Sequence, residues 1–214
     1  MRQILSIVPD HFQGVRSPAV ASKNWLTAVI VGDLLGFDSD FVIGYKGSKD
    51  QILGLLRGDF DVMGTSTSTA LPYIQAGDLR PLLKIGQSTV DSHPAYRDVP
   101  RLGGPDGLAA RRALILGRDP EEAQSLAEAL AETIAAGRIV ATPPGMEPGL
   151  ASCLEERLFE AMTDAEFEAA MAKAGRPIDV VRGTAATELI RAAKLETASF
   201  AKIIQKHMEK EGGQ

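Results

Sequence analysis

Three short runs of small and hydroxyl-bearing residues are the parts of this sequence best suited to chemistry. They are Ser22-Lys23-Asn24, Tyr45-Lys46-Gly47-Ser48 and Gly64-Thr65-Ser66-Thr67, the last of which continues through Ser68 to Thr69. Hydroxyl groups and the backbone N–H groups of glycine-containing turns donate hydrogen bonds, and several donors aimed at one point suit a carboxylate. Taken alone, Ser22 and Ser48 are equally typical of ordinary helix N-caps. The 64–69 run favours an anion site, because its small polar residues add little to a hydrophobic core.

The sequence lacks the motifs of common catalytic, nucleotide and metal sites. It has no GxGxxG, HExxH or GxSxG pattern, and residues 44–49 lack the GxxxxGK[ST] spacing of a phosphate-binding loop. The one cysteine, Cys153, excludes an intramolecular disulfide and a CxxC zinc site. Lysines near the three runs are expected to be solvated, and Schiff-base chemistry is the enzymatic alternative left open for them. We therefore predict no catalytic residue, no cofactor and no metal ion.

The charge balance argues against some classes of partner. With 23 basic and 28 acidic residues the formal net charge is −5, whereas a general nucleic-acid binder carries a basic stripe. No stretch approaches the roughly 20 apolar residues of a membrane span. The apolar run at 4–8 is shorter than a signal-peptide core of about 7–15 residues. Small anions remain suitable ligands, because helix N-termini bind them without net positive charge.

Alternating helix and strand patterns place the three runs at strand-to-helix junctions. Helices are expected at 22–35, 48–57, 69–76, 120–136, 148–162, 164–174 and 184–210, and strands at 4–8, 40–45, 60–63, 79–85, 138–141 and 178–181. This alternation predicts an α/β protein with a parallel-rich sheet flanked by helices. Such folds gather their ligand loops at the carboxyl ends of the strands. Loops 17–24, 45–49 and 64–69 are therefore expected to meet at one rim.

Three stretches resemble the TctC-like or Bug family, the substrate-binding component of tripartite tricarboxylate transporters. Residues 41–48 are similar to the family segment VxGYxGS, and residues 52–61 to LAxxRGEVD, with Asp59 in place of the glutamate. Residues 74–82 and 93–100 are similar to aGklRxL and hPdlpDVP. Residues 141–148 are similar to APPGvP and lead into a predicted helix pair, as in the family. The order and spacing of these segments carry the resemblance.

The resemblance implies a two-lobed fold of the type II periplasmic-binding-protein kind, with the ligand in the cleft between the lobes. Residues 1–137 would form the second lobe, and residues 138–214 a C-terminal segment that returns to an incomplete first lobe. The implied function is capture of a small carboxylate in the periplasm, without catalysis, together with the membrane permease subunits of the transporter. The implied ligand-binding residues are Ser22, Lys23, Asn24, Tyr45, Gly47, Ser48, Gly64, Thr65, Ser66 and Thr67.

An enzyme and an effector-binding regulatory domain are the alternatives to solute capture, and the N-terminal part of the sequence departs from the family. Family members begin with a signal peptide and a first-lobe segment that this sequence does not match. Three interpretations stay open: a fragment, a mis-assigned start, or a shortened relative that completes itself as a homodimer. An enzyme of similar α/β fold would need a charged catalytic constellation, which the three loops do not supply. An effector-binding regulatory domain would be accompanied by a DNA-binding segment upstream, which the reading frame before residue 1 would reveal.

Overall fold

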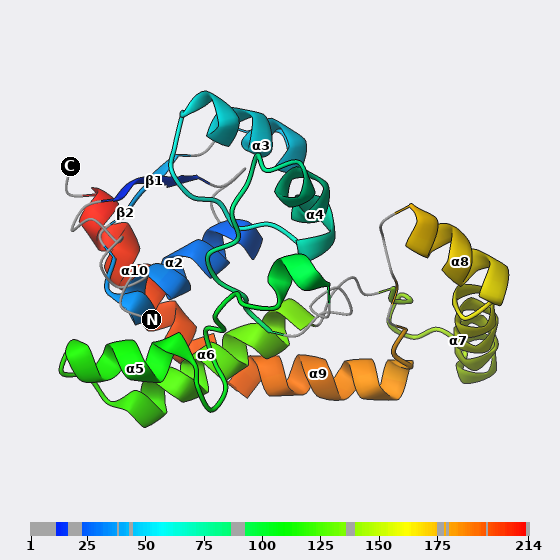
Figure 1. Ribbon diagram of the computed structural model, residues 1–214. Coiled ribbons are helices and arrows are strands. Elements are labelled where there is room, and N and C mark those ends of the chain that lie inside the picture. Colours follow the sequence, from blue (N-terminus) through cyan, green and yellow to red (C-terminus); the bar gives the residue numbers. More distant parts are fainter. Residues whose placement is uncertain are drawn as a thin grey trace.

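Helices make up most of the described chain. The computed structural model describes residues 12–16, 23–37, 39–42, 45–86, 93–135, 140–174, 178, 180–195 and 197–212. In chain order (Figure 1) the elements are β1 Phe12–Arg16, α2 Lys23–Leu35, β2 Ser39–Val42, α3 Ser48–Arg57, α4 Thr67–Gln75, η2 Pro94–Tyr96, α5 Leu108–Ile115, α6 Pro120–Ala135, α7 Pro148–Met162, α8 Ala165–Lys173, α9 Gly183–Leu195 and α10 Thr197–Gly212. Among these helices, none is long and apolar enough to span a membrane.

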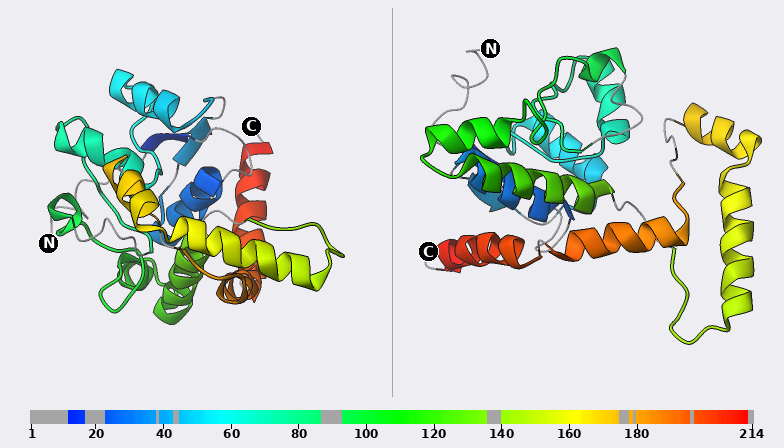
Figure 2. Two further views of the ribbon diagram at one scale, coloured as in Figure 1. Left: turned by 90° about the vertical axis from the view of Figure 1, so that its right-hand side faces the viewer. Right: turned by 90° about the horizontal axis from the view of Figure 1, so that it is seen from below.

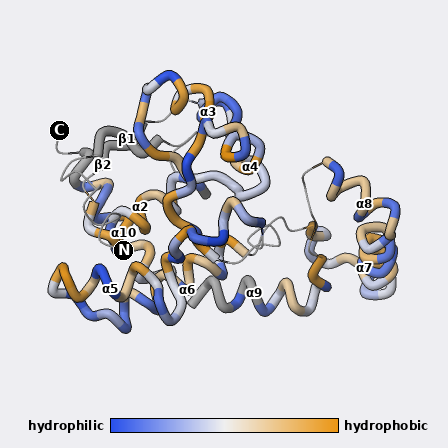
Figure 3. The backbone as a smooth tube through the Cα atoms, in the orientation of Figure 1, coloured by the Kyte–Doolittle hydropathy of each residue, from blue (hydrophilic) through white to orange (hydrophobic). Residues whose placement is uncertain are grey.

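The hydrophobic core forms around α2, which packs against α5, α6 and α10. This helix is apolar along most of its length (Figure 3), as suits an element with neighbours on several sides. Its Ile30 is fully buried in a cluster with Leu102 and Leu130. The apolar face predicted for α6 is confirmed, because Ala123, Leu126, Ala127 and Leu130 are all buried.

The carboxylate of Asp119 begins α6. Its Oδ1 accepts hydrogen bonds from the backbone amides of Glu121, at 2.8 Å, and Glu122, at 3.4 Å. Replacing Asp119 by alanine is expected to lower the free energy of unfolding by about 1 kcal/mol, because these helix-terminal donors lose their acceptor. Urea denaturation followed by circular dichroism measures the loss. Asp78→Ala is the matched control, since Asp78 lies exposed in the turn after α4; an equal loss there would contradict the assignment.

The predicted helices at 22–35, 48–57, 69–76, 120–136, 148–162 and 164–174 are confirmed as α2, α3, α4, α6, α7 and α8. Gly58 caps α3 in the left-handed conformation with φ 80°, which glycine adopts without strain. The single helix predicted at 184–210 is instead described as α9 and α10. The short helices η2 and α5 were not predicted.

The described strands form a smaller sheet than the sequence predicts. Strands β1 and β2 pair in parallel, with Phe12 opposite Ser39 and Arg16 opposite Val42. Strand β2, Ser39–Val42, overlaps the predicted strand at 40–45 over residues 40–42, whereas β1 falls in a region predicted to be loop. The predicted strand at 4–8 lies outside the described residues. The parallel pairing agrees with the prediction, but the extent of the sheet, in the part of the chain that the structure describes, does not.

Four predicted strands are wrong over the residues that are described. Residues 60–63 and 79–85 contain only isolated bridges, such as Lys84 with Arg101. Proline has no amide hydrogen and is poorly placed in a ladder, and Pro81 and Pro100 lie on the two segments that would pair there. In the predicted strands at 138–141 and 178–181, the described residues have no regular structure.

Helices α7 and α8 form an arm, residues 148–173, that lies apart from the core (Figures 1 and 2). Neither helix contains a buried residue. Leu150, Leu154 and Leu158, spaced at i, i+4 and i+8 along α7, are between 38% and 51% exposed. Asp164 caps α8 by accepting from two backbone amides at 3.0 Å. In contrast, α9 packs against α6 and α10 packs against α2.

Candidate functional site

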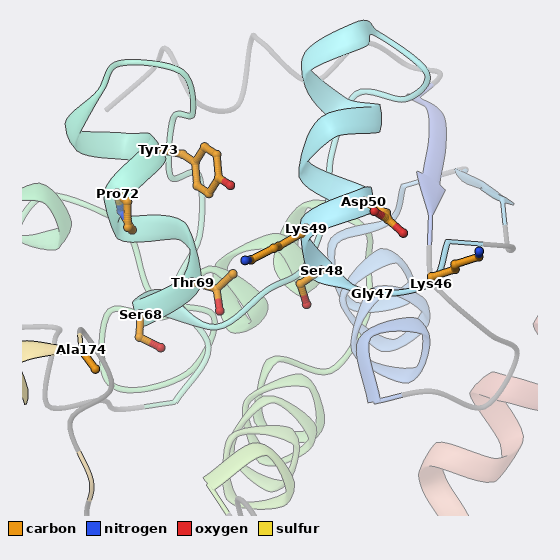
Figure 4. Close-up of a pocket in the computed structure, with 10 residues that line it drawn as sticks. All are labelled: Lys46, Gly47, Ser48, Lys49, Asp50, Ser68, Thr69, Pro72, Tyr73 and Ala174. Carbon is orange, nitrogen blue, oxygen red and sulfur yellow. The ribbon is translucent and has the colours of Figure 1, made fainter. Parts of the chain in front are cut away.

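A cavity of about 640 Å³ opens between the N-terminal ends of α3 and α4. Figure 4 shows the residues that line it: Lys46, Gly47, Ser48, Lys49, Asp50, Ser68, Thr69, Pro72, Tyr73 and Ala174. Two of the three loops singled out in the sequence, 45–49 and 64–69, therefore contribute to one hollow. A volume of this size falls in the range of small-molecule sites, about 300–1,000 Å³.

The wall formed by α3 presents the start of a helix that no side chain caps. Gly47, not Ser48, is its N-cap, and no side-chain cap hydrogen bond is present. The first intrahelical hydrogen bond runs from the Gln51 amide to the Gly47 carbonyl at 3.0 Å. The amide groups before it have no partner within the helix, and their partial positive charge attracts anions. The prediction that Ser48 caps this helix is therefore wrong, because Ser48 is its first residue.

Gly47 leaves the mouth of this helix end open. Its backbone is extended, with φ 172°, a conformation that any residue adopts. A Cβ atom added there would meet nothing within 4 Å. Glycine is therefore not needed at position 47 for its backbone conformation. Its lack of a side chain leaves the backbone amides at the start of α3 accessible.

Lys49 supplies the positive charge that points into the cavity. Figure 4 shows its side chain extending from α3 toward Thr69 on α4, while Lys46 and Asp50 point away from the centre. Among the described residues, no ion pair joins Lys49 to a carboxylate. An ammonium group in this position is available to an anion that enters from solvent.

The wall formed by α4 uses part of the 64–69 run to start the helix. Ser66 is the N-cap, and its Oγ accepts from the Thr69 amide at 3.3 Å. The same oxygen lies 2.7 Å from Thr69 Oγ1 and 3.3 Å from Ser68 Oγ. The hydroxyl of Ser66 is thus committed to local structure, and the side chains on the cavity wall are those of Ser68 and Thr69.

The other predicted residues of this run lie off the cavity wall. The carbonyl of Thr67 accepts from the Tyr96 hydroxyl at 2.6 Å, which ties the start of α4 to η2. Thr65 Oγ1 is buried without a hydrogen-bond partner in the described part of the chain. Gly64 has open space around its Cα. None of Gly64, Thr65, Ser66 and Thr67 lines the cavity.

Tyr45 does not line the cavity but contacts residues that follow α3. Its hydroxyl donates to Asp59 Oδ2 at 3.0 Å, and its ring meets Phe60 edge-on with centroids 5.6 Å apart. A Cβ atom at Gly54 would come within 2.7–2.9 Å of the Tyr45 ring, so the glycine allows α3 to pack on it. Arg57 contacts Asp59 at 2.9 Å, and this carboxylate raises the pKa of the Arg57 guanidinium. Tyr45 therefore anchors the turn that carries Gly47.

The first predicted loop is not placed at the cavity. Ser22 lies outside the described residues, Lys23 is the first residue of α2, and Asn24 follows in the same helix. Neither Lys23 nor Asn24 is among the lining residues. Of the nine predicted ligand-binding residues that the structure describes, Gly47 and Ser48 are the two that line the cavity.

The predicted ligand-binding residues leave out eight that line the cavity: Lys46, Lys49, Asp50, Ser68, Thr69, Pro72, Tyr73 and Ala174. A signal for Ser68 and Thr69 was present: serine is among the residue types preferred at helix N-caps, and Ser66 lies just before the predicted helix. Such a cap at Ser66 turns the hydroxyls that follow it outward from the helix end. No local signal brings Ala174, which follows α8, to the same wall. Within the described residues no cluster of three or more His, Cys, Asp or Glu side chains could hold a metal ion.

Comparison with solved structures identifies the fold around this cavity. The chain is similar to a TctC solute binding protein from Polaromonas, whose crystal structure holds no ligand. The TM-score is 0.58 at 16% sequence identity, and the match covers 96% of this chain and 61% of that one. This chain has a TctC-like fold.

The resemblance noted in the sequence is thus confirmed at the level of the fold, which is periplasmic-binding-protein-like. This chain spans 61% of the length of the solved TctC chain. That neighbour is a solute binding protein by its description. No protein-family model and no curated protein matches the chain.

Proposed function

We propose that this protein captures a small carboxylate in the cavity between α3 and α4. The observation that carries the proposal is the convergence of two features on one hollow of about 640 Å³: a helix N-terminus without a side-chain cap, and Lys49, which has no ion pair with the residues that the structure describes. A TctC-like fold, which a solute binding protein also has, supports the same reading. The site needs no nucleophile and no cofactor, because capture is reversible binding.

The proposed binding mode uses three kinds of donor. One carboxylate oxygen accepts from the free amides at the start of α3, where the helix dipole contributes about 0.3–1 kcal/mol. The hydroxyls of Ser48 and Thr69 supply neutral hydrogen bonds from the two walls. Lys49 donates a charge-assisted hydrogen bond, a type of bond that contributes about 1.5–3 kcal/mol. Loop 17–24, also predicted to bind ligand, remains a proposed contributor.

We also propose a transport system and a cellular compartment for the protein. Solute capture with this fold suits the extracytoplasmic component of a tripartite tricarboxylate transporter, which passes its ligand to membrane permease subunits. Residues 1–137 would then act as the ligand-holding lobe, and residues 138–214 as the returning segment. The periplasm is the corresponding compartment. These assignments rest on the resemblance and on the fold rather than on the cavity.

Isothermal titration calorimetry with succinate, citrate, glutamate and benzoate tests the capture proposal. At least one of these anions is expected to bind saturably. At 100 times its dissociation constant it should raise the free energy of unfolding by about 2.7 kcal/mol. Succinamide, which has the shape of succinate without its charge, is the matched control for the dicarboxylate. The proposal fails if the folded protein binds none of the anions, or binds succinamide as well as succinate.

A further inference from the structure

A compact contact cluster joins the α7–α8 arm to the start of α9. The Arg182 guanidinium meets both carboxylate oxygens of Glu156, with N···O distances of 3.1 and 3.4 Å. Its Cζ also lies 3.9 Å from the centroid of the Phe159 ring. Next to it, the Gly183 amide donates to Glu155 Oε1 at 2.9 Å. Two residues at the beginning of α9 thus hold three residues of one α7 segment.

These contacts are the hydrogen bonds and ion pairs that connect the arm to α9 in the described chain. Glu155 and Phe159 are four residues apart and share a face of α7. The exposed leucines Leu150, Leu154 and Leu158 follow a separate stripe along the helix. Because neither α7 nor α8 has a buried residue, no hydrophobic core fixes the orientation of the arm. Among the described residues, the Arg182 cluster then supplies the polar contacts that tie the arm to α9.

The cluster connects the arm to α9, which packs against the core, and a residue at the end of the arm lines the cavity. Helix α9, which follows Arg182, packs against α6 of the core. At the other end of the arm, Ala174 directly follows α8 and lines the cavity with Ser68 and Thr69 (Figure 4). A change in the angle between α7 and α9 would therefore move Ala174 relative to the α4 wall.

We propose that Arg182 is a positioning residue that fixes the α7–α8 arm against α9 and thereby sets the width of the cavity. The second part of this inference rests on the proposed function, whereas the first part concerns the geometry of the arm alone. Arginine suits the task because its planar guanidinium can pair with a carboxylate in a fork and stack on an aromatic ring at the same time. The pair with Arg182 lowers the pKa of Glu156, and the same contact raises the pKa of Arg182.

Distance measurement between spin labels on the arm and on the core tests the positioning role. Cys153, the one cysteine of the chain, is replaced by serine, and cysteines are introduced at the exposed positions Ala169 on α8 and Ser125 on α6. Double electron–electron resonance is expected to give one narrow distance peak in this background. Arg182→Ala should lose that peak and give a broad, shifted distribution. Arg182→Lys, which keeps the charge without the fork, should fall between the two.

Arg191→Ala is the matched control, because Arg191 is an exposed arginine of α9 that pairs with Glu188 within its own helix. Its distance peak should equal that of the parent. An unchanged peak in Arg182→Ala, or equal broadening in both variants, overturns the positioning role.

Calorimetry with a carboxylate that the parent binds tests the link to the cavity. Arg182→Ala is expected to bind it several-fold more weakly, with the urea midpoint of the core unchanged. A shifted arm with unchanged affinity overturns the link. If the parent binds no carboxylate, the proposed function fails, and the spin-label distances still decide the role of Arg182 in the arm.

Discussion

Lys49→Gln is expected to weaken the binding of a small carboxylate about tenfold or more, because the cavity loses the ammonium group that reaches toward Thr69. A charge-assisted hydrogen bond contributes about 1.5–3 kcal/mol, and about 1.4 kcal/mol corresponds to a factor of ten in affinity. Lys49→Glu should abolish measurable binding, since it places a negative charge opposite the ligand. Isothermal titration calorimetry on both variants measures the change.

The control for this charge effect is Lys202→Gln. Lys202 is an exposed lysine of α10, so its replacement changes the net charge of the protein by the same amount. Lys202→Gln should retain the affinity of the parent. Similar losses in the Lys49 and Lys202 variants would show that overall charge, and not the cavity, governs binding. Retained affinity in Lys49→Glu would remove Lys49 from the site.

Leu130→Ala is expected to cost about 2–5 kcal/mol in the free energy of unfolding, because it leaves a void in the centre of the core. Leu130 is fully buried on α6, in the cluster that also contains Ile30 and Leu102. Close packing around a helix with neighbours on several sides limits how far such a void can collapse. Urea denaturation, fitted to a two-state transition, gives the difference from the parent.

The matched control for this core substitution is Leu114→Ala. Leu114 has the same side chain, also lies in a helix, and is 67% exposed on α5. Its replacement should change stability by less than about 0.5 kcal/mol. A loss in Leu130→Ala no larger than that of Leu114→Ala would mean that the core does not lie around α2 and α6.

The helices could be predicted from the sequence because their signals are local. The apolar residues of α6 recur at helical spacing, and Gly58 ends α3 in the conformation that glycine adopts most readily. Helix α5 was missed because it is short and follows a stretch rich in glycine and proline. Its burial comes from packing on α2 and α6, which no local pattern records.

The sheet could not be predicted to the same degree, because strands depend on partners distant in the sequence. Leu79 to Ile85 has the composition of a strand, but the described chain offers it only the bridge between Lys84 and Arg101. Strand β1 has a weak local pattern and forms by pairing with β2. Packing with distant parts of the chain therefore overrode the local preference, both in residues 79–85 and in β1.

The sequence predicts the region of the cavity better than the residues that line it. Runs 45–48 and 64–69 do contribute to one cavity, but which side chains face it depends on where each helix begins. Because α4 begins at Thr67, Ser66 serves as its cap, and Ser68 and Thr69 lie on the wall. Ala174 lines the cavity because the end of α8 lies near α4, a long-range contact that no local sequence pattern predicts.

Chemical-shift mapping by ¹⁵N–¹H NMR during titration with the best-binding carboxylate tests the central claim most directly. The account predicts that the largest saturable shifts fall on the amides at the start of α3, from Gly47 to Asp50, and on Ser68 and Thr69 of α4. Saturable binding whose shifts lie elsewhere, for example on α5 and α10 alone, would contradict it.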